Sequence, residues 1–250
     1  MFIESSQNKI IKEINSLKQR KYREQKGLFI VEGERLLSEA RPLYVLASED
    51  YEGKVSGFEK VYTTARPLFD KTADTVNPQG ILGVCRIPEN DIADIPEKPF
   101  LVLLERVTDP GNLGTIIRTA DAAGADGVVL SKGCTDPYNL KTIRSTMGSI
   151  FHLPVYTDVD LYKFMKNTEI KTFAAHLKGT KSCFDADMTG GIGILIGNEA
   201  NGLSDEISEM ATELVKIPMP GKAESMNAAV AAGIMIYEAV RQNGERNHVL

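Results

Sequence analysis

From residue 100 onward, short apolar runs alternate with stretches of helical periodicity. The apolar runs read FLVLLE, GVVL, TFAA, IGILIG and LVKI. Strands that are buried on both faces of a sheet need such continuous runs, and the helices between them connect parallel strands. The pattern predicts an α/β domain with a mainly parallel sheet. Within it we expect a strand at residues 192–196, a helix from about Asn112 to Ala123 that Gly124 closes, and a helix from about Ser225 to Gln242.

The first 97 residues carry shorter apolar segments, LFIVEG, LYVLAS and GILGVCR, which predict a smaller α/β unit. Between the two halves, NDIADIPEKPF has the Asn, Asp, Pro and Glu content of a linker. A chain of 250 residues is long enough for two modest domains. We therefore expect one domain over residues 1–97 and a second over residues 98–250.

Composition excludes several classes of protein. The 42% hydrophobic and 25% charged fractions are ordinary for a globular chain. No run of about 18 apolar residues could cross a membrane, and MFIESSQNKIIKEI lacks the apolar segment of a signal peptide, so we expect a cytoplasmic protein. The cysteines and histidines are scattered without CxxC spacing, which predicts neither disulfides nor a metal site. They are Cys85, Cys134, Cys183, His152, His176 and His248.

Basic residues are concentrated in residues 9–26, although the whole chain has a net charge of −5. This stretch has seven Lys or Arg against two Glu, a local charge of +5, so the remainder sums to −10. Ile10, Ile14 and Leu17 recur at helical spacing and predict a buried stripe with the basic side chains facing solvent. The basic face is either a plain solvated helix surface or a patch that binds RNA or another acidic surface.

Three segments of the second half follow predicted strands, where α/β sheets bind their ligands. In the first, ERVTDPGNLGTIIRTADAAGA, Asn112 is the expected helix cap, and Arg118 either grips a phosphate or is a surface charge. In the second, LIGNEANGL, Gly197 would let the backbone approach a ligand because it has no Cβ. Glu199 could accept hydrogen bonds from hydroxyls or pair with Arg118, Ser204 resembles a helix cap, and a plain loop is the alternative.

The third segment is IPMPGKAESMNAAVAAGIMIYEAVRQ, in which a strand ending at Ile217 leads through a Pro-Gly loop into a helix. Its small residues permit close approach of a cofactor or of another helix. We expect this helix to bury Met226, Val230, Ile234 and Tyr237. None of the three segments has the GxGxxG or GxxxxGK[ST] pattern, so neither a Rossmann nor a P-loop site is indicated, although another nucleotide-binding enzyme stays possible.

Together and in order, the three segments resemble the motifs of the SpoU (TrmH) family of RNA ribose 2′-O-methyltransferases. The matching stretches are NLGTIIRTADAAGADGVVL, LIGNEANGLSDEI and IPMPGKAESMNAAVAAGIMIYE. In the first half, SLKQRKYREQKGLFIVEGERLLSEA and DTVNPQGILGVCR are similar to the ribosomal-protein-like substrate-binding domain that precedes the catalytic domain in many members. The resemblance implies a C-terminal SPOUT-type domain with a trefoil knot and a homodimer formed through that domain. It also implies S-adenosylmethionine as cofactor, no metal, and RNA as substrate, with ribosomal RNA as the expected class.

The resemblance also assigns residues. The catalytic positions correspond to Asn112, Arg118, Glu199, Ser225 and Asn227. The cofactor-binding positions correspond to Leu195, Gly197, Asn198, Ile217, Met219, Met226 and Ala228. From the charge pattern, Lys18, Arg20, Lys21 and Arg23 are the expected RNA-binding residues. Two positions depart from the family pattern: Met226 replaces a usual Leu at similar volume, and Ala229 removes a frequent Ser hydroxyl.

The implied chemistry is the alignment of a ribose hydroxyl with an electrophilic methyl group and the removal of a proton. Family descriptions propose the Arg as the base, but a guanidinium hardly deprotonates in proteins. We therefore expect Arg118 to bind the adjacent phosphate and to orient the hydroxyl, with the phosphate or Glu199 as proton acceptor. The alternatives are a transfer RNA substrate, a catalytically silent RNA-binding protein of the same fold, or a small-molecule methyltransferase. Intact motif residues disfavour the silent protein, and the basic first half disfavours the small molecule.

Overall fold

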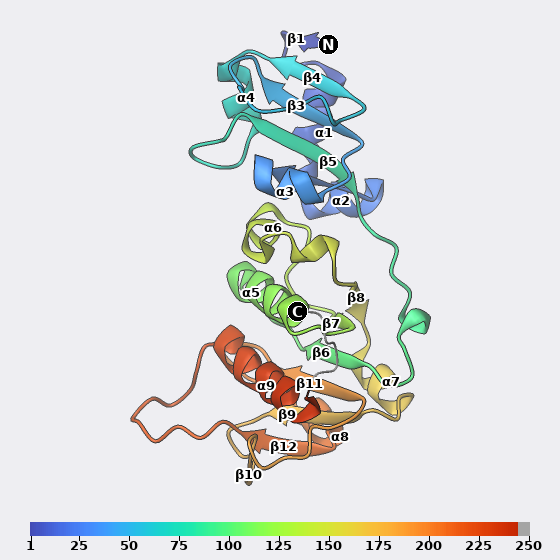
Figure 1. Cartoon of the computed structure of the whole chain (residues 1–250), viewed down its shortest axis with the longest axis vertical. Helices are drawn as coiled ribbons and strands as arrows, with labels where there is room; N and C mark the ends of the chain where they lie inside the picture. The colour runs from blue at the N-terminus through green and yellow to red at the C-terminus, as the bar shows by residue number, and fades with distance from the viewer. Residues whose placement is uncertain (245–250) are drawn as a thin grey trace. The chain divides into compact units, whose positions relative to one another are not determined.

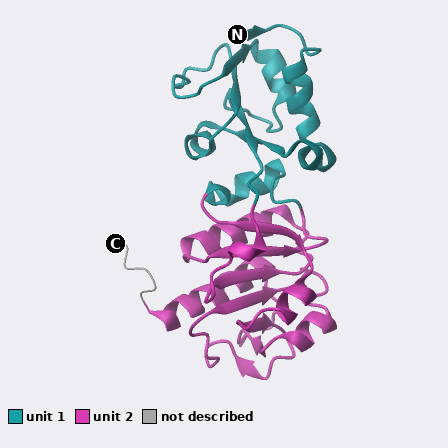
Figure 2. Cartoon of the chain, turned by 90° about the vertical axis from the view of Figure 1, so that its right-hand side faces the viewer, with its two compact units in different colours: residues 1–89, 136–151 teal, residues 90–135, 152–250 magenta. Residues whose placement is uncertain are grey.

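The computed structural model describes residues 1–244, which form two compact units (Figure 2). The first unit combines residues 1–89 with residues 136–151, and the second combines residues 90–135 with the chain from residue 152 onward. The chain therefore passes between the units three times. The sequence suggested one passage, near residue 97, and the return of residues 136–151 to the first unit has no counterpart in that expectation.

The first unit has a five-stranded sheet in the order β1-β4-β3-β5-β2 (Figure 1). The strands are β1 (Phe2–Ile3), β2 (Leu28–Glu32), β3 (Tyr44–Ser48), β4 (Val61–Thr64) and β5 (Ile81–Arg86). The pairs β1/β4 and β3/β4 are parallel, whereas β5 runs antiparallel to β3 and β2. The helices from residues 1–89 are α1 (Lys9–Leu17), α2 (Arg20–Lys26), α3 (Glu34–Glu39) and α4 (Arg66–Thr72). A small α/β unit is what the sequence predicted here.

The basic stretch of residues 9–26 forms two helices, not one. Asn8 caps α1 by accepting a hydrogen bond from the Ile10 N–H at 2.9 Å. Ile10, Ile14 and Leu17 are buried, as the periodicity predicted. The helix α1 stops at Leu17. The helix α2 stops at Lys26, and its C-cap is Gly27, whose φ of 63° is a left-handed conformation that favours glycine.

Residues 136–151 pack onto the first unit through α6 (Leu140–Thr146) and a short 3₁₀ turn, η2 (Ser149–Phe151). Leu140 joins the hydrophobic core that contains Ile30 and Leu82. The ring of Phe29 lies 5.1 Å from that of Tyr138, centroid to centroid, and 6.3 Å from that of Phe151. The segment thus contributes apolar side chains to a core that residues 1–89 begin.

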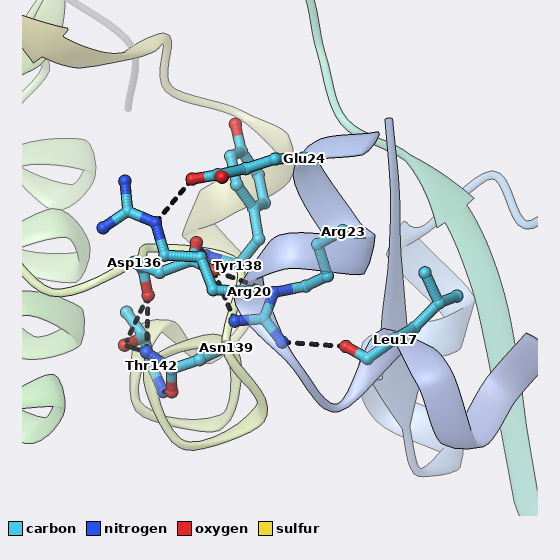
Figure 3. A network of polar contacts seen from close by, with 8 residues as sticks. All are labelled: Leu17, Arg20, Arg23, Glu24, Asp136, Tyr138, Asn139 and Thr142. Atoms are coloured by element: carbon cyan, nitrogen blue, oxygen red, sulfur yellow. Dashed lines mark hydrogen bonds and ion pairs between the residues drawn. The ribbon is translucent and has the colours of Figure 1, made fainter. Parts of the chain in front are cut away.

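A buried ion pair fixes the start of this segment (Figure 3). Arg23 is only 4% exposed; its Nε donates to Asp136 Oδ2 at 2.8 Å, and its Nη1 donates to the Leu17 carbonyl at 2.8 Å. Asn139 caps α6 by accepting from the Thr142 N–H at 2.9 Å. The ion pair and the ring contacts therefore hold residues 136–151 against α2 and β2, and the cap stabilises α6 itself.

The second unit has a seven-stranded sheet in the order β10-β12-β9-β11-β6-β7-β8. The strands are β6 (Phe100–Leu104), β7 (Gly127–Ser131), β8 (Val155–Val159), β9 (Lys171–Ala175), β10 (Lys181–Ser182), β11 (Ile192–Ile196) and β12 (Glu213–Lys216). Every described pair of neighbours is parallel, which confirms the predicted sheet. The edge strands β8 and β10 were missed because their sequences lack a continuous apolar run.

Helices cover both faces of this sheet. They are α5 (Pro110–Ala122), α7 (Leu161–Lys166), α8 (Asp205–Met210) and α9 (Ala228–Asn243), and a 3₁₀ turn, η1 (Ile92–Asp94), interrupts the expected linker. Leu161 of α7 and Ile207 of α8 pack with Leu195 of β11 in one cluster. The helices α5 and α9 lie side by side (Figure 1). Within residues 1–244, no helix is both long and apolar enough to cross a membrane.

Candidate active site

The register of the central strands brings the three motif segments to one edge of the sheet. Leu104 of β6 is paired with Ile196 of β11 and with Leu130 of β7, so these strands end at the same level. The strand β12 runs parallel to them, and residues 217–227 leave from its carboxyl end. Because all strands point the same way, the loops that begin at residues 105, 197 and 217 share one edge, where α/β sheets bind ligands.

The helix α5 begins earlier than the sequence predicted. Its N-cap is Asp109, whose Oδ1 accepts from the Asn112 N–H at 2.8 Å, and Pro110 occupies the first turn. The prediction that Asn112 caps this helix is therefore wrong. Proline suits the first helical position because its nitrogen has no hydrogen to leave unpaired. With Asp109 as the cap, the Asn112 side chain is left to bond elsewhere.

Glu199 connects the second motif to the first. Its Oε2 accepts from the N–H and the hydroxyl of Thr108, both at 3.2 Å. Its Oε1 accepts from the Asp109 N–H at 3.2 Å and from Asn112 Nδ2 at 3.1 Å. Burial raises the pKa of Glu199, but these hydrogen bonds outweigh it and leave the pKa below its ordinary value. The side chain is therefore a carboxylate at neutral pH.

Asn227 connects the third motif to the same network. Its Nδ2 donates to Asn112 Oδ1 at 2.9 Å, and its own Oδ1 caps α9 by accepting from the Ala229 N–H at 2.9 Å. The helix thus begins at Ala228, later than predicted. Ser225, the other expected residue of this motif, lies in the exposed loop before it. Asn112 therefore stands between Glu199 and Asn227, and one chain of hydrogen bonds links all three motifs.

Arg118 does not pair with Glu199. It lies on α5 with its side chain exposed, and no hydrogen bond or ion pair joins it to another residue of the described chain. The alternative in which Glu199 holds Arg118 in position is therefore wrong in this structure. The carboxylate of Glu199 is instead satisfied by the 108–112 segment. The guanidinium of Arg118 keeps its donors for a ligand.

Gly197 has a different reason for being glycine than the one expected. A Cβ at this position would lie 2.2 Å from both the Gly202 carbonyl carbon and the Leu203 nitrogen. Asn198 and Gly202 form an isolated bridge with N–H to carbonyl distances of 2.8 and 3.0 Å. The missing side chain therefore makes room for the motif's own returning backbone. Ser204 caps α8, as predicted.

Sequence reasoning missed Glu105, Arg106 and Thr108. Glu105 is buried, and its Oε2 accepts from the Ser204 N–H at 2.7 Å. Asn198 Nδ2 donates to the Arg106 carbonyl at 2.8 Å, which joins the first two motifs a second time. One signal was available in the sequence: Glu105 ends the apolar run FLVLLE, and a carboxylate next to a buried strand needs a hydrogen-bond partner.

The expected cofactor residues fall into two groups. Leu195 is fully buried in β11, and Gly197 and Asn198 form the turn that follows it. Ile217, Met219, Met226 and Ala228 lie in or beside the loop between β12 and α9. Within the described chain, residues 218–226 make no hydrogen bond to one another or to other residues. Their backbone donors and acceptors are therefore free to bind a polar ligand.

The predicted buried face of α9 is wrong at three of its four positions, and the fourth, Ile234, is half-buried. Met226, Val230 and Tyr237 are 37%, 53% and 50% exposed. The buried positions are Ala228, Ala229, Ala232, Met235, Ile236, Glu238 and Ala239. Four of these seven buried residues are alanines, and α9 packs against both α5 and β11. The larger apolar residues consequently form an exposed stripe.

The four expected RNA-binding residues differ in their surroundings. Arg20 and Lys21 are exposed, and Arg20 pairs with Glu24 on the same helix. Lys18 is half-buried and donates to the Ala73 carbonyl at 3.1 Å. Arg23 is buried against Asp136, so it has no guanidinium surface to offer to RNA. Its assignment as an RNA contact is therefore corrected to a structural ion pair.

Burial raises the pKa of all three cysteine thiols, that of Cys85 to about 12. None of them is therefore a reactive thiolate at neutral pH. His152 bonds Asp121 at 3.1 Å, and the ring of His176 accepts from the Lys178 N–H at 3.1 Å. His248 lies outside the described residues. In residues 1–244, no group of three or more His, Cys, Asp or Glu could hold a metal ion.

An all-parallel sheet with polar side chains gathered at its carboxyl edge defines an α/β enzyme that binds its ligands there. Comparison with known families narrows this class. The SpoU rRNA Methylase family matches residues 99–237, and the MRM3-like substrate binding domain matches residues 8–83. The chain belongs to the SpoU rRNA methylase family.

Individual relatives cover nearly the whole chain. It is 34% identical to a 23S rRNA (guanosine(2553)-2′-O)-methyltransferase of Bacillus subtilis over 94% of this chain and 97% of that protein. The structure of an AdoMet-bound rRNA methyltransferase from Sinorhizobium meliloti superposes with a TM-score of 0.85 at 34% identity, covering 96% of this chain and 97% of that one. The AviRb methyltransferase of Streptomyces viridochromogenes in complex with AdoMet gives 0.84 at 31% identity, covering 94% and 98%. The resemblance read from the three motifs is thereby confirmed.

Proposed function

We propose that this RNA ribose 2′-O-methyltransferase acts on ribosomal RNA, with S-adenosylmethionine as the methyl donor. The observation that carries the proposal is the hydrogen-bonded chain Glu199–Asn112–Asn227, which joins the three family motifs at the ligand-binding edge of the sheet. Two of the relatives that match nearly the whole chain, those of Bacillus subtilis and Sinorhizobium meliloti, are named as methyltransferases of ribosomal RNA. Both halves of those proteins are present here, which favours the same class of substrate.

The residues at the sheet edge fit the cofactor. An adenosyl group presents hydrogen-bond donors and acceptors on its base and ribose, and residues 218–226 have backbone groups that nothing else in the described chain uses. We place the cofactor against Leu195, Gly197 and Asn198 on one side and against Ile217, Met219, Met226 and Ala228 on the other. When bound, S-adenosylmethionine supplies a methyl group that is electrophilic because it is attached to a sulfonium.

The side chains of this enzyme then orient the hydroxyl and its phosphate. Arg118 has a free, planar guanidinium that suits two oxygens of a phosphate, and it stays protonated at all working pH values. It therefore binds the RNA rather than acting as the base. Glu199 is a poor base as well, because its pKa is lowered. Its role is to hold Asn112, and through it Asn227, so the proton of the hydroxyl leaves to the RNA phosphate or to solvent.

Dimerisation is part of the proposal. Four apolar residues on or next to α9 are at least a third exposed: Met226, Val230, Tyr237 and Val240. An exposed apolar stripe beside a ligand site suits a second copy of the same chain. We propose a homodimer through the second unit, with the trefoil knot of the family in that unit. A cytoplasmic location follows from the proposed substrate.

We propose that the N-terminal part of the chain, residues 1–97, captures RNA and that residues 98–250 transfer the methyl group. The match of residues 8–83 to a substrate-binding domain supports this division. Within the basic stretch, Arg20 and Lys21 are two of the exposed cations of α2. Single-stranded or irregular RNA is recognised by shape and by phosphate contacts, so these charges contribute affinity rather than sequence choice.

The test is to map 2′-O-methyl groups in total RNA from cells that lack the gene and from cells complemented with the Arg118→Ala variant. One 23S rRNA position should lose its methyl group in both strains and regain it with the wild-type gene. Loss at a transfer RNA position would replace ribosomal RNA as the substrate. An unchanged map, together with RNA binding by the purified protein, would instead indicate a silent RNA-binding protein.

A further inference from the structure

Arg106 has a backbone conformation that side chains rarely adopt. It directly follows Glu105 at the end of β6, and its φ is 51°, in the left-handed region. A residue with a Cβ costs roughly 1–2 kcal/mol more than glycine in this conformation. Such outliers persist where surrounding structure enforces them, and they are concentrated at functional sites.

The surrounding structure fixes this backbone on both sides. The Arg106 N–H donates to Ser131 Oγ at 2.9 Å, and its carbonyl accepts from Asn198 Nδ2 at 2.8 Å. The stem of the side chain lies beside Gly133, where a Cβ would come within 3.2 Å of Arg106 Cγ. These interactions direct the side chain along one path. A glycine at position 106 would keep both backbone hydrogen bonds and would lack only the packing of the stem.

The guanidinium itself contributes little to stability. Its Nη2 donates to Glu105 Oε1 at 2.9 Å, but the Arg106 side chain is 53% exposed. Exposed ion pairs typically contribute about 0–1 kcal/mol, which does not exceed the backbone cost. The buried Glu105 carboxylate has a second hydrogen-bond donor, because its other oxygen accepts from the Ser204 N–H. Loss of the Arg106 guanidinium would therefore not leave Glu105 without a partner. The fold therefore gains nothing clear from arginine at this position.

The position is nevertheless joined to the catalytic network. The Asn198 amide that binds the Arg106 carbonyl also lies 3.5 Å from Glu199 Oε2. Glu199 in turn holds Asn112. Arg106 thus projects into solvent from the edge where the three motifs meet, with one side of its guanidinium on Glu105. The remaining N–H groups have no partner in the described chain.

We propose that Arg106 is a substrate-binding residue whose guanidinium binds a phosphate of the RNA strand that enters the active site. A planar guanidinium matches two phosphate oxygens, and anchoring by Glu105 reduces the entropy lost on binding. The proposal rests on the proposed function and adds to it a second phosphate-binding side chain besides Arg118. The left-handed backbone conformation of Arg106 determines the direction of this side chain.

The test compares Arg106→Gly, Arg106→Ala and Arg106→Lys with wild type. The probe is an unmodified 23S rRNA transcript, with S-adenosylmethionine as donor. Arg106→Gly removes the guanidinium and relieves the backbone, whereas Arg106→Ala removes the guanidinium and keeps the backbone cost. We expect both to raise KM for RNA by about tenfold with kcat and S-adenosylmethionine affinity unchanged, since a charge-assisted hydrogen bond is removed. The Arg106→Gly variant should melt at or above the wild-type temperature, and the KM of the Arg106→Lys variant should lie between those of wild type and Arg106→Ala.

Lys98→Ala is the matched control, because Lys98 is an exposed cation at the opposite end of the same strand. It should leave KM for RNA unchanged. The salt dependence of RNA affinity should fall by about 0.7–0.9 units of log-log slope in the glycine variant and not in the control. An unchanged KM, or a loss confined to kcat, would overturn the proposed binding of phosphate. If wild type does not methylate the transcript at all, the proposed function fails instead, and the RNA-affinity measurement still judges Arg106.

Discussion

Glu199 accepts four hydrogen bonds from residues 108–112, and a charged acceptor is what those donors need. Glu199→Gln keeps the shape but replaces one oxygen with an amide that cannot accept. We expect kcat to fall by at least tenfold, because Asn112 and Asn227 lose their common anchor. Affinity for S-adenosylmethionine should change less than kcat. Single-turnover methylation and calorimetry measure the two effects.

The lowered pKa of Glu199 gives the same variant a pH signature. A carboxyl group with a folded-state pKa below its unfolded value of 4.5 stabilises the fold above that value, and this stability is lost as pH falls through the folded pKa. The difference in unfolding free energy between wild type and Glu199→Gln should therefore be constant from about pH 7 to pH 5 and shrink below about pH 4. Urea titrations across this range measure it. A difference that grows on acidification would contradict the ionised state.

Arg118 permits a second test at the scale of one side chain. Because its guanidinium has no partner in the described chain, Arg118→Ala should leave stability and S-adenosylmethionine affinity nearly unchanged. Turnover should fall on the order of 100-fold, since a group that orients the reacting hydroxyl is removed. Arg118→Lys keeps the charge without the planar fork and should stay badly impaired. Equal losses of turnover and cofactor affinity would place Arg118 in the cofactor site instead.

At the scale of helices and strands, the sequence predicted most of the second unit. Continuous apolar runs identify β6, β7, β9, β11 and β12, because strands buried on both faces have no other composition. Helix starts were harder, since Asp109 and Asn112 are both good caps and only the three-dimensional path decides between them. The buried face of α9 could not be predicted, because apolar residues surround this helix and tertiary packing decides which of them are buried.

The ion pair between α2 and residues 136–151 is a test of how the first unit is built. Arg23→Ala would leave the Asp136 carboxylate, whose side chain is only 12% exposed, without its ionic partner. Breaking a buried pair typically costs about 3–5 kcal/mol, and we expect a loss at the lower end of that range. Arg20→Ala is the control on the same helix, because its pair with Glu24 is exposed and should change stability by less than about 1 kcal/mol. Urea unfolding measures both. Similar small effects would mean that the Arg23 pair is not needed to hold the segment.

The exposed face of α9 predicts the oligomeric state. Tyr237→Glu should convert the proposed dimer into a monomer of 27.4 kDa at micromolar concentration, because a buried charge would be introduced at the interface. Leu177→Glu is the control, since Leu177 is also exposed, at 68%, but lies outside this helix. Light scattering distinguishes the two masses. A wild-type protein that is already monomeric would refute the dimer.

For the molecule as a whole, RNA capture should depend on the first unit. Replacing Arg20 and Lys21 by Ala should lower RNA affinity and reduce the salt dependence by about 0.7 units of log-log slope for each single-strand phosphate that is no longer neutralised. Replacing Lys163 and Lys166 of α7 makes the same change in net charge on the second unit and should have a smaller effect. Affinity measured at several salt concentrations tests this. Equal effects would indicate general electrostatic attraction rather than a binding surface.

The sequence predicted which residues meet at the candidate site better than it predicted the contacts that hold them there. The three motifs, and Glu199, Asn112 and Asn227 within them, meet as expected, because parallel strands place their following loops at one edge. Partner choice was not predictable: Glu199 bonds Thr108 instead of Arg118, and Gly197 accommodates the motif's own backbone. Such choices depend on distances of a few ångström between segments about 90 residues apart. Sequence spacing does not contain them.

Residues 136–151 complete the first unit although they are encoded in the middle of the second. In a chimaera, residues 1–97 could be exchanged for those of another family member. The incoming residues would then pack against an α6 from a different sequence. The incoming β2 and α2 would meet a Leu140, Tyr138 and Asp136 that were selected for Phe29 and Arg23. Recombination within the family should succeed when both stretches are exchanged together, because the first unit is encoded by two separate stretches of the gene.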